Sequence, residues 1–178
     1  MVSAVIIATS YGVERDEIVV PRDQLTSIGV SVTVATPSNH AIETLVGDRE
    51  TGPIVDSDVL LSEIRADDYD LLVIPGGTIN ADSLRLEDDA KRIAADFAKA
   101  GKPIAAICHG PWLIAETDFA VGKSLTSYPS LRTDINNAGG IWVDEPVVVD
   151  ETNGFVLITS RTPDDLGQFT TAIERQVA

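Results

Sequence analysis

The sequence of 178 residues contains a single cysteine, Cys108, and a histidine, His109, follows it directly. A thiol becomes a strong nucleophile when a neighbouring base takes its proton or when a positive potential stabilises the thiolate. This pair is therefore a candidate nucleophile and base. A lone cysteine in an apolar run is more often a core residue, however, so the residues on either side must decide between the two interpretations.

The residues around Cys108 predict a sharp corner between a strand and a helix. KPIAAIC (102–108) is a short apolar run typical of a buried strand, and GPWLIAE (110–116) begins a helix at once. Gly110 permits a close approach of the backbone, and Pro111 suits the first turn of a helix. A side chain at such a corner points out of the top of the sheet, as the serine of the Gly-x-Ser-x-Gly turn does. The helix N-terminus also favours a thiolate, so the pattern favours a nucleophile.

The rest of the sequence alternates between apolar strand-like runs and amphipathic helix patterns. This order predicts a three-layer α/β/α sandwich with a mostly parallel sheet, in one domain over residues 1–178. We expect a kink or break at Pro21 in the first helix, and a hairpin or an irregular extended segment at 50–58. Strands are expected at 3–9, 30–37, 70–77, 102–108 and in 141–161, where ETNG (151–154) forms a turn, and helices at 14–29, 59–69, 86–101, 110–116, 130–140 and 163–177.

Ligands of open α/β sheets bind beyond the carboxyl ends of the strands. Three segments at such ends carry residues suited to chemistry. They are Gly76-Gly77, Cys108-His109 and the loop that leads into Glu14 and Glu17.

The composition restricts the class of protein. Asp and Glu number 28 against 13 Lys and Arg, a net charge of −15 that argues against nucleic acid or an anionic membrane as partner. No apolar run approaches the roughly 20 residues of a membrane helix, and the first residues read as a strand rather than a signal peptide. One cysteine excludes an internal disulfide, which favours a cytoplasmic protein. The 4 lysines, and 18 aspartates against 10 glutamates, fit a salt-adapted host or an ordinary acidic protein.

A metal site has little support in the sequence. Zinc sites need several Cys or His ligands at short spacings. The chain has one cysteine and two histidines, without a His-x-x-x-His pattern, and the second histidine, His40, lies in a polar loop. We therefore expect no metal.

Five ordered segments resemble the PfpI/ThiJ-type proteins of the class I glutamine-amidotransferase-like superfamily. The likeness extends over almost the whole chain. It implies the flavodoxin-like form of the sandwich and places the chain nearest the PfpI-like branch of intracellular cysteine peptidases and stress proteins. The segments are ERDEIVVP (14–21), VIPGG (73–77), GKPIAAICHGPW (101–112), LTSYPSLRTDINNAGGIWVDEPVVVD (125–150) and SRTPDDLGQF (160–169).

The resemblance assigns roles to single residues. Cys108 matches the nucleophile, His109 the neighbouring histidine and Glu17 the glutamate that contacts the thiol. Gly77 of the Gly76-Gly77 turn and the N–H of His109 match an oxyanion hole. An ionised carboxylate beside sulfur would raise the pKa of the thiol, whereas a protonated one donates a hydrogen bond to the thiolate and lowers that pKa. We therefore expect Glu17 to be largely protonated near pH 7.

Three further residues are assigned with alternatives left open. Asp82 matches an acid that a neighbouring subunit contributes to orient the histidine, which implies a homo-oligomer (dimer, trimer or hexamer). The same residue also suits a helix N-cap. Trp112 and Tyr128 flank the motif and either line a substrate pocket or pack in the core or an interface.

The resemblance implies a cofactor-independent enzyme whose thiolate attacks a carbonyl carbon. One such reaction is hydrolysis of a peptide or amide through an acyl-enzyme. The other is glyoxalase or protein deglycase chemistry on methylglyoxal and its early adducts. Both need an activated thiolate, a proton shuttle and an oxyanion hole, so the sequence leaves them open. The alternatives to an enzyme are a sensor that works by oxidation of Cys108 and a stress chaperone.

Overall fold

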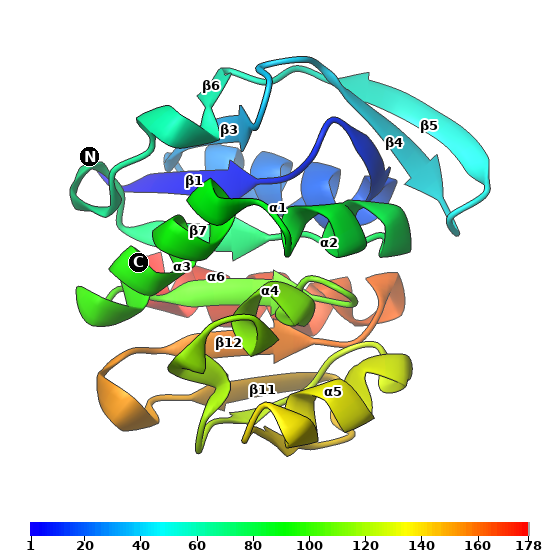
Figure 1. Ribbon diagram of the computed structural model, residues 1–178. Coiled ribbons are helices and arrows are strands. Elements are labelled where there is room, and N and C mark those ends of the chain that lie inside the picture. Colours follow the sequence, from blue (N-terminus) through cyan, green and yellow to red (C-terminus); the bar gives the residue numbers. More distant parts are fainter. Residues whose placement is uncertain (178) are drawn as a thin grey trace.

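The computed structural model describes residues 1–177, and its main feature is a seven-stranded sheet. Neighbouring strands are parallel, except that β11 runs antiparallel to β12. Helices lie on both faces of this sheet (Figure 1). The predicted α/β/α sandwich with a mostly parallel sheet is confirmed. The strand order is β11 (Val147–Asp150), β12 (Leu157–Ser160), β8 (Ile104–Ile107), β7 (Leu71–Ile74), β1 (Ser3–Ile7), β3 (Ser31–Thr36) and β6 (Val59–Leu60).

The helices divide between the two faces of the sheet. In Figure 1, α1 and α6 lie behind the sheet and the other four lie in front of it. Of the kink or break predicted at Pro21, the break is wrong, because α1 continues through this buried proline. The predicted ETNG turn is present between β11 and β12. The helices are α1 (Arg15–Ser27), α2 (Thr78–Leu84), α3 (Asp88–Lys99), α4 (Pro111–Ala115), α5 (Arg132–Asn137) and α6 (Leu166–Val177).

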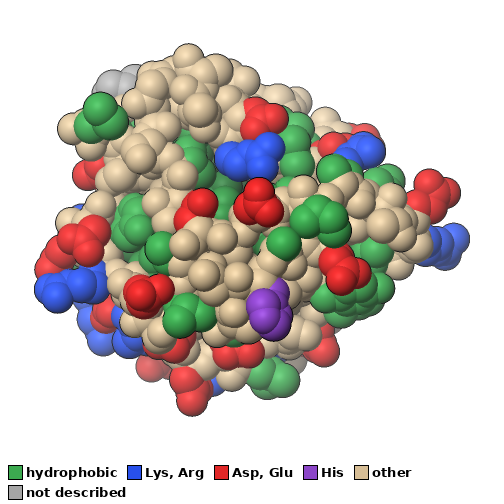
Figure 2. All heavy atoms as spheres, turned by 90° about the horizontal axis from the view of Figure 1, so that it is seen from above, with side chains coloured by type: hydrophobic (Ala, Val, Ile, Leu, Met, Phe, Trp, Pro, Cys, Tyr) green, Lys and Arg blue, Asp and Glu red, His purple; other side chains and the backbone are tan. Residues whose placement is uncertain are grey.

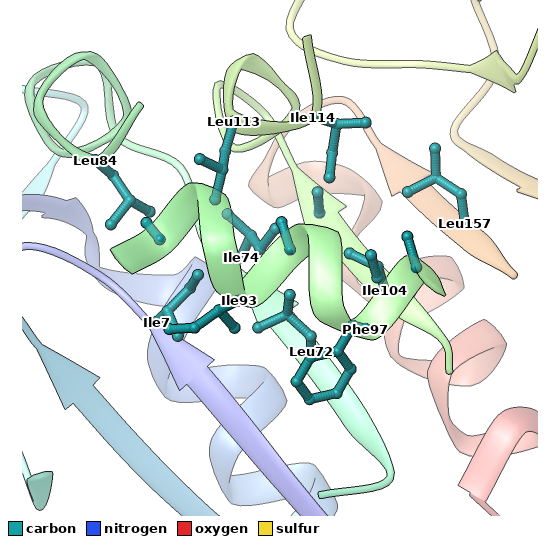
Figure 3. Packing of buried hydrophobic residues seen from close by; sticks show 14 of the residues in the cluster. Ile7, Leu72, Ile74, Leu84, Ile93, Phe97, Ile104, Leu113, Ile114 and Leu157 are labelled. Carbon is teal, nitrogen blue, oxygen red and sulfur yellow. The ribbon is translucent and has the colours of Figure 1, made fainter. Parts of the chain in front are cut away.

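Two apolar cores hold the layers together. The front core lies between the sheet and α3, whose Ile93 and Phe97 face the strands (Figure 3). Both side chains are buried, and each contributes roughly 1.5–3 kcal/mol by leaving water. The second core lies under α1 and α6 and includes Cys108. The central strands β7 and β8 are therefore buried on both faces, which fixes where their carboxyl ends lie.

A separate three-stranded sheet forms an arm beside the main sheet. It consists of β2 (Tyr11–Glu14), β4 (Ile42–Val46) and β5 (Glu50–Val55), and β4 pairs antiparallel with β5. The segment 50–58, expected to be a hairpin or an irregular extended segment, instead contributes β5, the second strand of a hairpin that begins at Ile42. The helix expected at 59–69 is also wrong, because this segment forms β6 and two short 3₁₀ turns.

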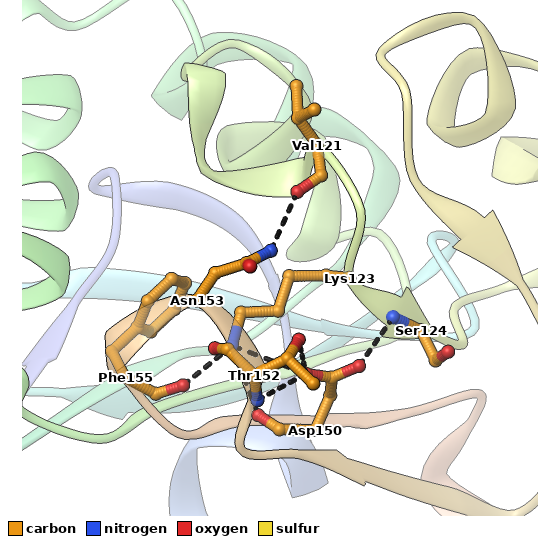
Figure 4. A network of polar contacts seen from close by, with 7 residues as sticks. All are labelled: Val121, Lys123, Ser124, Asp150, Thr152, Asn153 and Phe155. Atoms are coloured by element: carbon orange, nitrogen blue, oxygen red, sulfur yellow. Dashed lines mark hydrogen bonds and ion pairs between the residues drawn. The ribbon is translucent and has the colours of Figure 1, made fainter.

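A buried lysine ties the loop between β11 and β12 to the body of the protein. The side chain of Lys123 is fully buried, and its Nζ donates to backbone carbonyls of Asp150, Thr152 and Phe155. It also lies 3.3 Å from the Asp150 carboxylate (Figure 4). One ammonium group thus satisfies the inward-facing oxygens of a whole turn.

Acidic residues outnumber basic ones, 28 against 13. Figure 2 shows one face, on which carboxylates are scattered and basic side chains lie beside acidic ones. Among residues 1–177, no helix is long and apolar enough to span a bilayer.

Candidate active site around Cys108

Cys108 occupies the corner between β8 and α4 that the sequence predicts. Its backbone is left-handed, with φ of +60°, a conformation that costs a non-glycine residue about 1–3 kcal/mol. Hydrogen bonds fix both of its backbone groups, because its N–H donates to the Ser160 carbonyl (3.0 Å) and its carbonyl accepts from the Tyr128 N–H (2.8 Å). The strained corner thus holds the sulfur at the carboxyl end of the central strand.

A cavity of about 440 Å³ opens over this corner. Its size suits a small ligand. It brings together the predicted residues Glu17, Gly77, Cys108 and His109, although they lie far apart in the sequence. Its wall consists of Glu14, Asp16, Glu17, Val46, Gly47, Asp48, Gly77, Thr78, Cys108, His109, Tyr128 and Pro163.

The thiol and the imidazole are in direct contact. Cys108 Sγ lies 3.2 Å from His109 Nδ1. Burial lowers the pKa of His109, whereas the negative charge of Asp48 raises it, and the net change is a decrease. The imidazole is therefore neutral near pH 7 and can accept a proton. The ring of Tyr128 stacks on it with centroids 4.7 Å apart.

Glu17 lies fully buried beside the thiol. Its Oε2 accepts the Gly76 N–H at 2.7 Å, and its Oε1 has no hydrogen-bond partner among the described residues. Burial raises the pKa of Glu17 well above its ordinary value, against the opposing effect of hydrogen bonds from Gly76 and Cys108. This direction matches the expectation that Glu17 holds a proton near pH 7.

The thiol pKa is set by opposing influences. Burial raises the pKa of Cys108, and an ionised Glu17 carboxylate raises it further. Hydrogen bonds from the backbone N–H groups of His109 and Gly77 lower this pKa, but the net change is an increase. These are the two N–H groups expected for the oxyanion hole, and both point toward the sulfur region. Their geometry is able to stabilise negative charge that forms there.

The two glycines after β7 are required by close packing. Gly77 has φ of +84°, a conformation that glycine adopts without strain. A Cβ added to Gly76 would lie 2.6 Å from Glu17 Oε2 and 2.8 Å from the His109 backbone nitrogen. Any side chain at Gly76 would therefore push apart two parts of the site.

We predict that Gly76→Ala lowers the free energy of unfolding by about 1–3 kcal/mol because the site is overpacked. Thiol reactivity should change as well, since Glu17 or His109 must move. Gly167→Ala is the matched control, because that α6 glycine has nothing within 4 Å of an added Cβ. Urea unfolding and thiol labelling rates measure both effects, and equal stability of the two variants would refute the packing argument.

Asp82 and Trp112 lie outside the cavity wall. Asp82 is exposed in the middle of α2, which begins at Thr78 after Gly77, so the alternative N-cap role is wrong. Its role as an acid from a neighbouring subunit stays a prediction. Trp112 packs edge-on against His109 with ring centroids 5.2 Å apart, and its Nε1 donates to Asp134. Trp112 therefore contacts the imidazole without lining the pocket, whereas Tyr128 is part of the pocket wall.

Two residues of the wall, Asp48 and Thr78, were missed in the sequence. Asp48 lies at the tip of the β4–β5 hairpin, and its carboxylate accepts both the N–H and the hydroxyl of Thr78. The Thr78 hydroxyl oxygen in turn lies 3.4 Å from His109 Nε2. The Gly47-Asp48 pair is a recognisable hairpin-turn signal, and it was the clue available in the sequence.

Among residues 1–177, no group of three or more His, Cys, Asp or Glu side chains is placed to hold an ion.

Comparisons with known sequences show which family the chain resembles. The sequence model of the DJ-1/PfpI family matches residues 2–176. A protein of Archaeoglobus fulgidus is 38% identical over 165 residues, which are 93% of this chain and 92% of that protein. A Bacillus subtilis protein named "Putative cysteine protease YraA" is 43% identical over 118 residues, 66% of this chain and 67% of that protein.

Solved structures show the same fold. DJ-1beta of Drosophila melanogaster superposes with a TM-score of 0.86 at 31% identity, over 99% of this chain and 90% of that one. A two-domain protein of Anabaena variabilis, with DJ-1/ThiJ/PfpI-like and ferritin-like domains, gives a TM-score of 0.90 at 33% identity. That match covers 99% of this chain and 48% of the other, so the chain spans about half of the larger protein.

Proposed function

Because the chain belongs to the DJ-1/PfpI family, we propose that it is an enzyme whose Cys108 thiolate attacks a carbonyl carbon. One observation carries the proposal. A cysteine held at positive φ lies 3.2 Å from a buried, neutral imidazole in the wall of a cavity. Structural cysteines have no need of a strained backbone or of an adjacent base.

The first step of the proposed reaction forms the thiolate. His109 Nδ1 takes the thiol proton, and the sulfur then adds to the carbonyl carbon of the substrate. The carbonyl oxygen becomes an oxyanion that the N–H groups of Gly77 and His109 stabilise. Glu17, carrying a proton, donates a hydrogen bond to the sulfur and limits the charge that builds up there.

The proposed substrate is a small aldehyde of the methylglyoxal type. The cavity of about 440 Å³ holds such a molecule readily, whereas a folded polypeptide cannot bring its backbone to the buried sulfur. Addition of the thiolate to the aldehyde gives a hemithioacetal, and hydrolysis of the thioester formed from it by proton transfer yields lactate and the free thiol. Peptidase activity on short peptides is the second candidate, favoured by the name of the B. subtilis relative.

The experiment compares wild type with Cys108→Ser on methylglyoxal and on a set of short peptides. We expect turnover of methylglyoxal to fall by at least about a thousandfold in the variant, since hydroxyl is a far weaker nucleophile than thiolate. Turnover of peptides without turnover of methylglyoxal would show that the protein is a peptidase and not a glyoxalase. Cysteine-independent turnover would refute Cys108 as the nucleophile. No turnover together with ready peroxide oxidation of Cys108 would favour a redox sensor, and suppression of aggregation that survives Cys108→Ser would favour a chaperone.

A further inference from the structure

We infer that Asp48 and Thr78 fix the tautomer of His109 within a single chain. Nδ1, the ring nitrogen next to the thiol, is then the unprotonated one. The inference rests on the proposed role of His109 as base. It makes Asp48 and Thr78 positioning residues, because neither touches the sulfur in the structure.

The argument begins with the single proton of the Thr78 hydroxyl. Asp48 Oδ2 lies 2.6 Å from Thr78 Oγ1, and Asp48 Oδ1 accepts the Thr78 backbone N–H at 2.9 Å. An ionised carboxylate only accepts hydrogen bonds, so the hydroxyl proton points to Asp48. The hydroxyl oxygen is then left with lone pairs alone for its other neighbour.

That other neighbour is His109 Nε2, at 3.4 Å. Because the oxygen can only accept, Nε2 must carry the ring proton. A neutral imidazole has one N–H, so Nδ1 is unprotonated, and it is the atom 3.2 Å from Cys108 Sγ. The histidine is thus held in the one tautomer that is able to take the thiol proton. The long Nε2 distance is typical of catalytic hydrogen bonds before substrate binds.

The hairpin tip is built to hold Asp48 in place. Gly47 and Asp48 have φ of +60° and +59°, the positive values that a type I′ turn requires, and the turn is closed by a hydrogen bond from the Arg49 N–H to the Val46 carbonyl. Glu14 Oε2 accepts the Gly47 N–H at 2.8 Å. A left-handed aspartate is uncommon, and here that conformation turns its carboxylate toward α2.

Asp48 also acts on the charge that forms in the reaction. Its negative charge raises the pKa of His109 against the effect of burial, so it favours the imidazolium produced by proton transfer. The other ionisable neighbours of the ring at the cavity are Glu14, Asp16, Glu17, Cys108 and Tyr128. Among these groups, Asp48 is the acid linked to Nε2 through Thr78. The third group of a Cys–His–acid arrangement is therefore present in one chain.

The test uses the fact that the chain has only two histidines. Nitrogen-15 NMR of ring-labelled protein distinguishes the Nδ1–H and Nε2–H tautomers, and the exposed His40 serves as an internal reference. We expect wild-type His109 to be in the Nε2–H form. Thr78→Val keeps the shape but removes the acceptor, so it should lose this preference and lower kcat more than it changes KM. Thr78→Ser keeps the hydroxyl and should restore both.

Asp48→Asn tests the carboxylate in the same spectra. An amide replaces one of the two acceptor oxygens with an NH2 donor, so one of the two Thr78 groups faces a donor instead of an acceptor, and the tautomer preference should weaken. Glu50→Gln removes one charge from the same hairpin and is the matched control, expected to resemble wild type. An Nδ1–H tautomer in wild type, or a Thr78→Val spectrum identical to wild type, would overturn the inference. Cysteine-independent turnover with the expected tautomer would instead refute the proposed function alone.

Discussion

The stability advantage of Glu17→Gln over wild type is expected to grow with pH, by about 1.4 kcal/mol for each unit above about pH 4.5. Glu17 is fully buried, and burial raises its pKa well above the ordinary value of 4.5. In the unfolded chain the same carboxyl ionises near its ordinary value. Glutamine does not titrate, so the difference between the two proteins isolates this one group.

The sign follows from proton counting. Between the unfolded and the folded pKa of Glu17, the folded protein holds a proton that the unfolded chain has lost. The unfolded state then binds fewer protons, so the stability of wild type falls as pH rises. The stabilising contribution of the protonated carboxyl is complete below about pH 4.5 and is lost by the time pH has passed the folded pKa. Glu17→Gln also keeps an oxygen to accept the Gly76 N–H.

Urea unfolding of both proteins at pH 4.5, 5.5, 6.5 and 7.5 measures the difference. Glu43→Gln, which removes an exposed carboxyl from β4, corrects for the general loss of one negative charge. If the difference in free energy of unfolding between the two proteins stays constant over this range, Glu17 is ionised in the folded protein at neutral pH. It could then not donate a hydrogen bond to the thiolate. The measurement does not depend on knowing the substrate.

Local sequence signals predicted the nucleophile corner well. An apolar run followed at once by Gly110-Pro111 leaves little choice but a strand that turns directly into a helix. The same locality explains the errors. Gly77 caps α2 without a Ser, Thr, Asp or Asn signal, so the start of α2 at Thr78 was missed. α1 continues through Pro21, which is buried beside α6, and a propensity rule does not include such packing.

The partners of the nucleophile depended on long-range contacts. Glu17 reaches the sulfur because α1 packs against the sheet, and its role came from the family resemblance, since a glutamate in a helix is by itself usually solvated. Asp48 was missed because its position depends on β4 pairing with β2, more than thirty residues away in the sequence. Side chains that arrive at a site from a different sheet leave no periodic signal.

Lys123→Met is expected to lower the free energy of unfolding by about 3–5 kcal/mol, the usual effect of removing one partner of a buried ion pair. Lys123 is one of only four lysines, and its side chain is fully buried. Its ammonium donates to the Phe155 carbonyl at 2.6 Å and lies 4.0 Å from the centre of the Phe155 ring. Methionine fills a similar volume but leaves the carbonyls without the lysine donor and removes the positive charge beside the Asp150 carboxylate.

A second lysine provides the matched control. Lys102 Nζ also donates to backbone carbonyls, those of Ala66 and Tyr69, at 2.7 and 2.6 Å, but this side chain is only partly buried. Water replaces the lost donor there, so Lys102→Met should cost less than about 1.5 kcal/mol. Equal losses for the two variants would show that burial of the ammonium is not what stabilises the turn.

The pH dependence of stability distinguishes the contribution of the Lys123–Asp150 ion pair from that of the hydrogen bonds to the carbonyls. Burial raises the pKa of Asp150, but hydrogen bonds from Thr152, Ser124 and Lys123 outweigh it and hold the pKa at about 2. Its stabilising contribution is therefore present above the unfolded pKa of about 3.9 and is lost as pH falls toward 2. In Lys123→Met, one of these donors is gone, so the acid transition should begin at a higher pH than in wild type. Asp150→Asn is the control, because asparagine does not titrate. If the loss of stability at acid pH is the same in Asp150→Asn as in wild type, another carboxylate causes it.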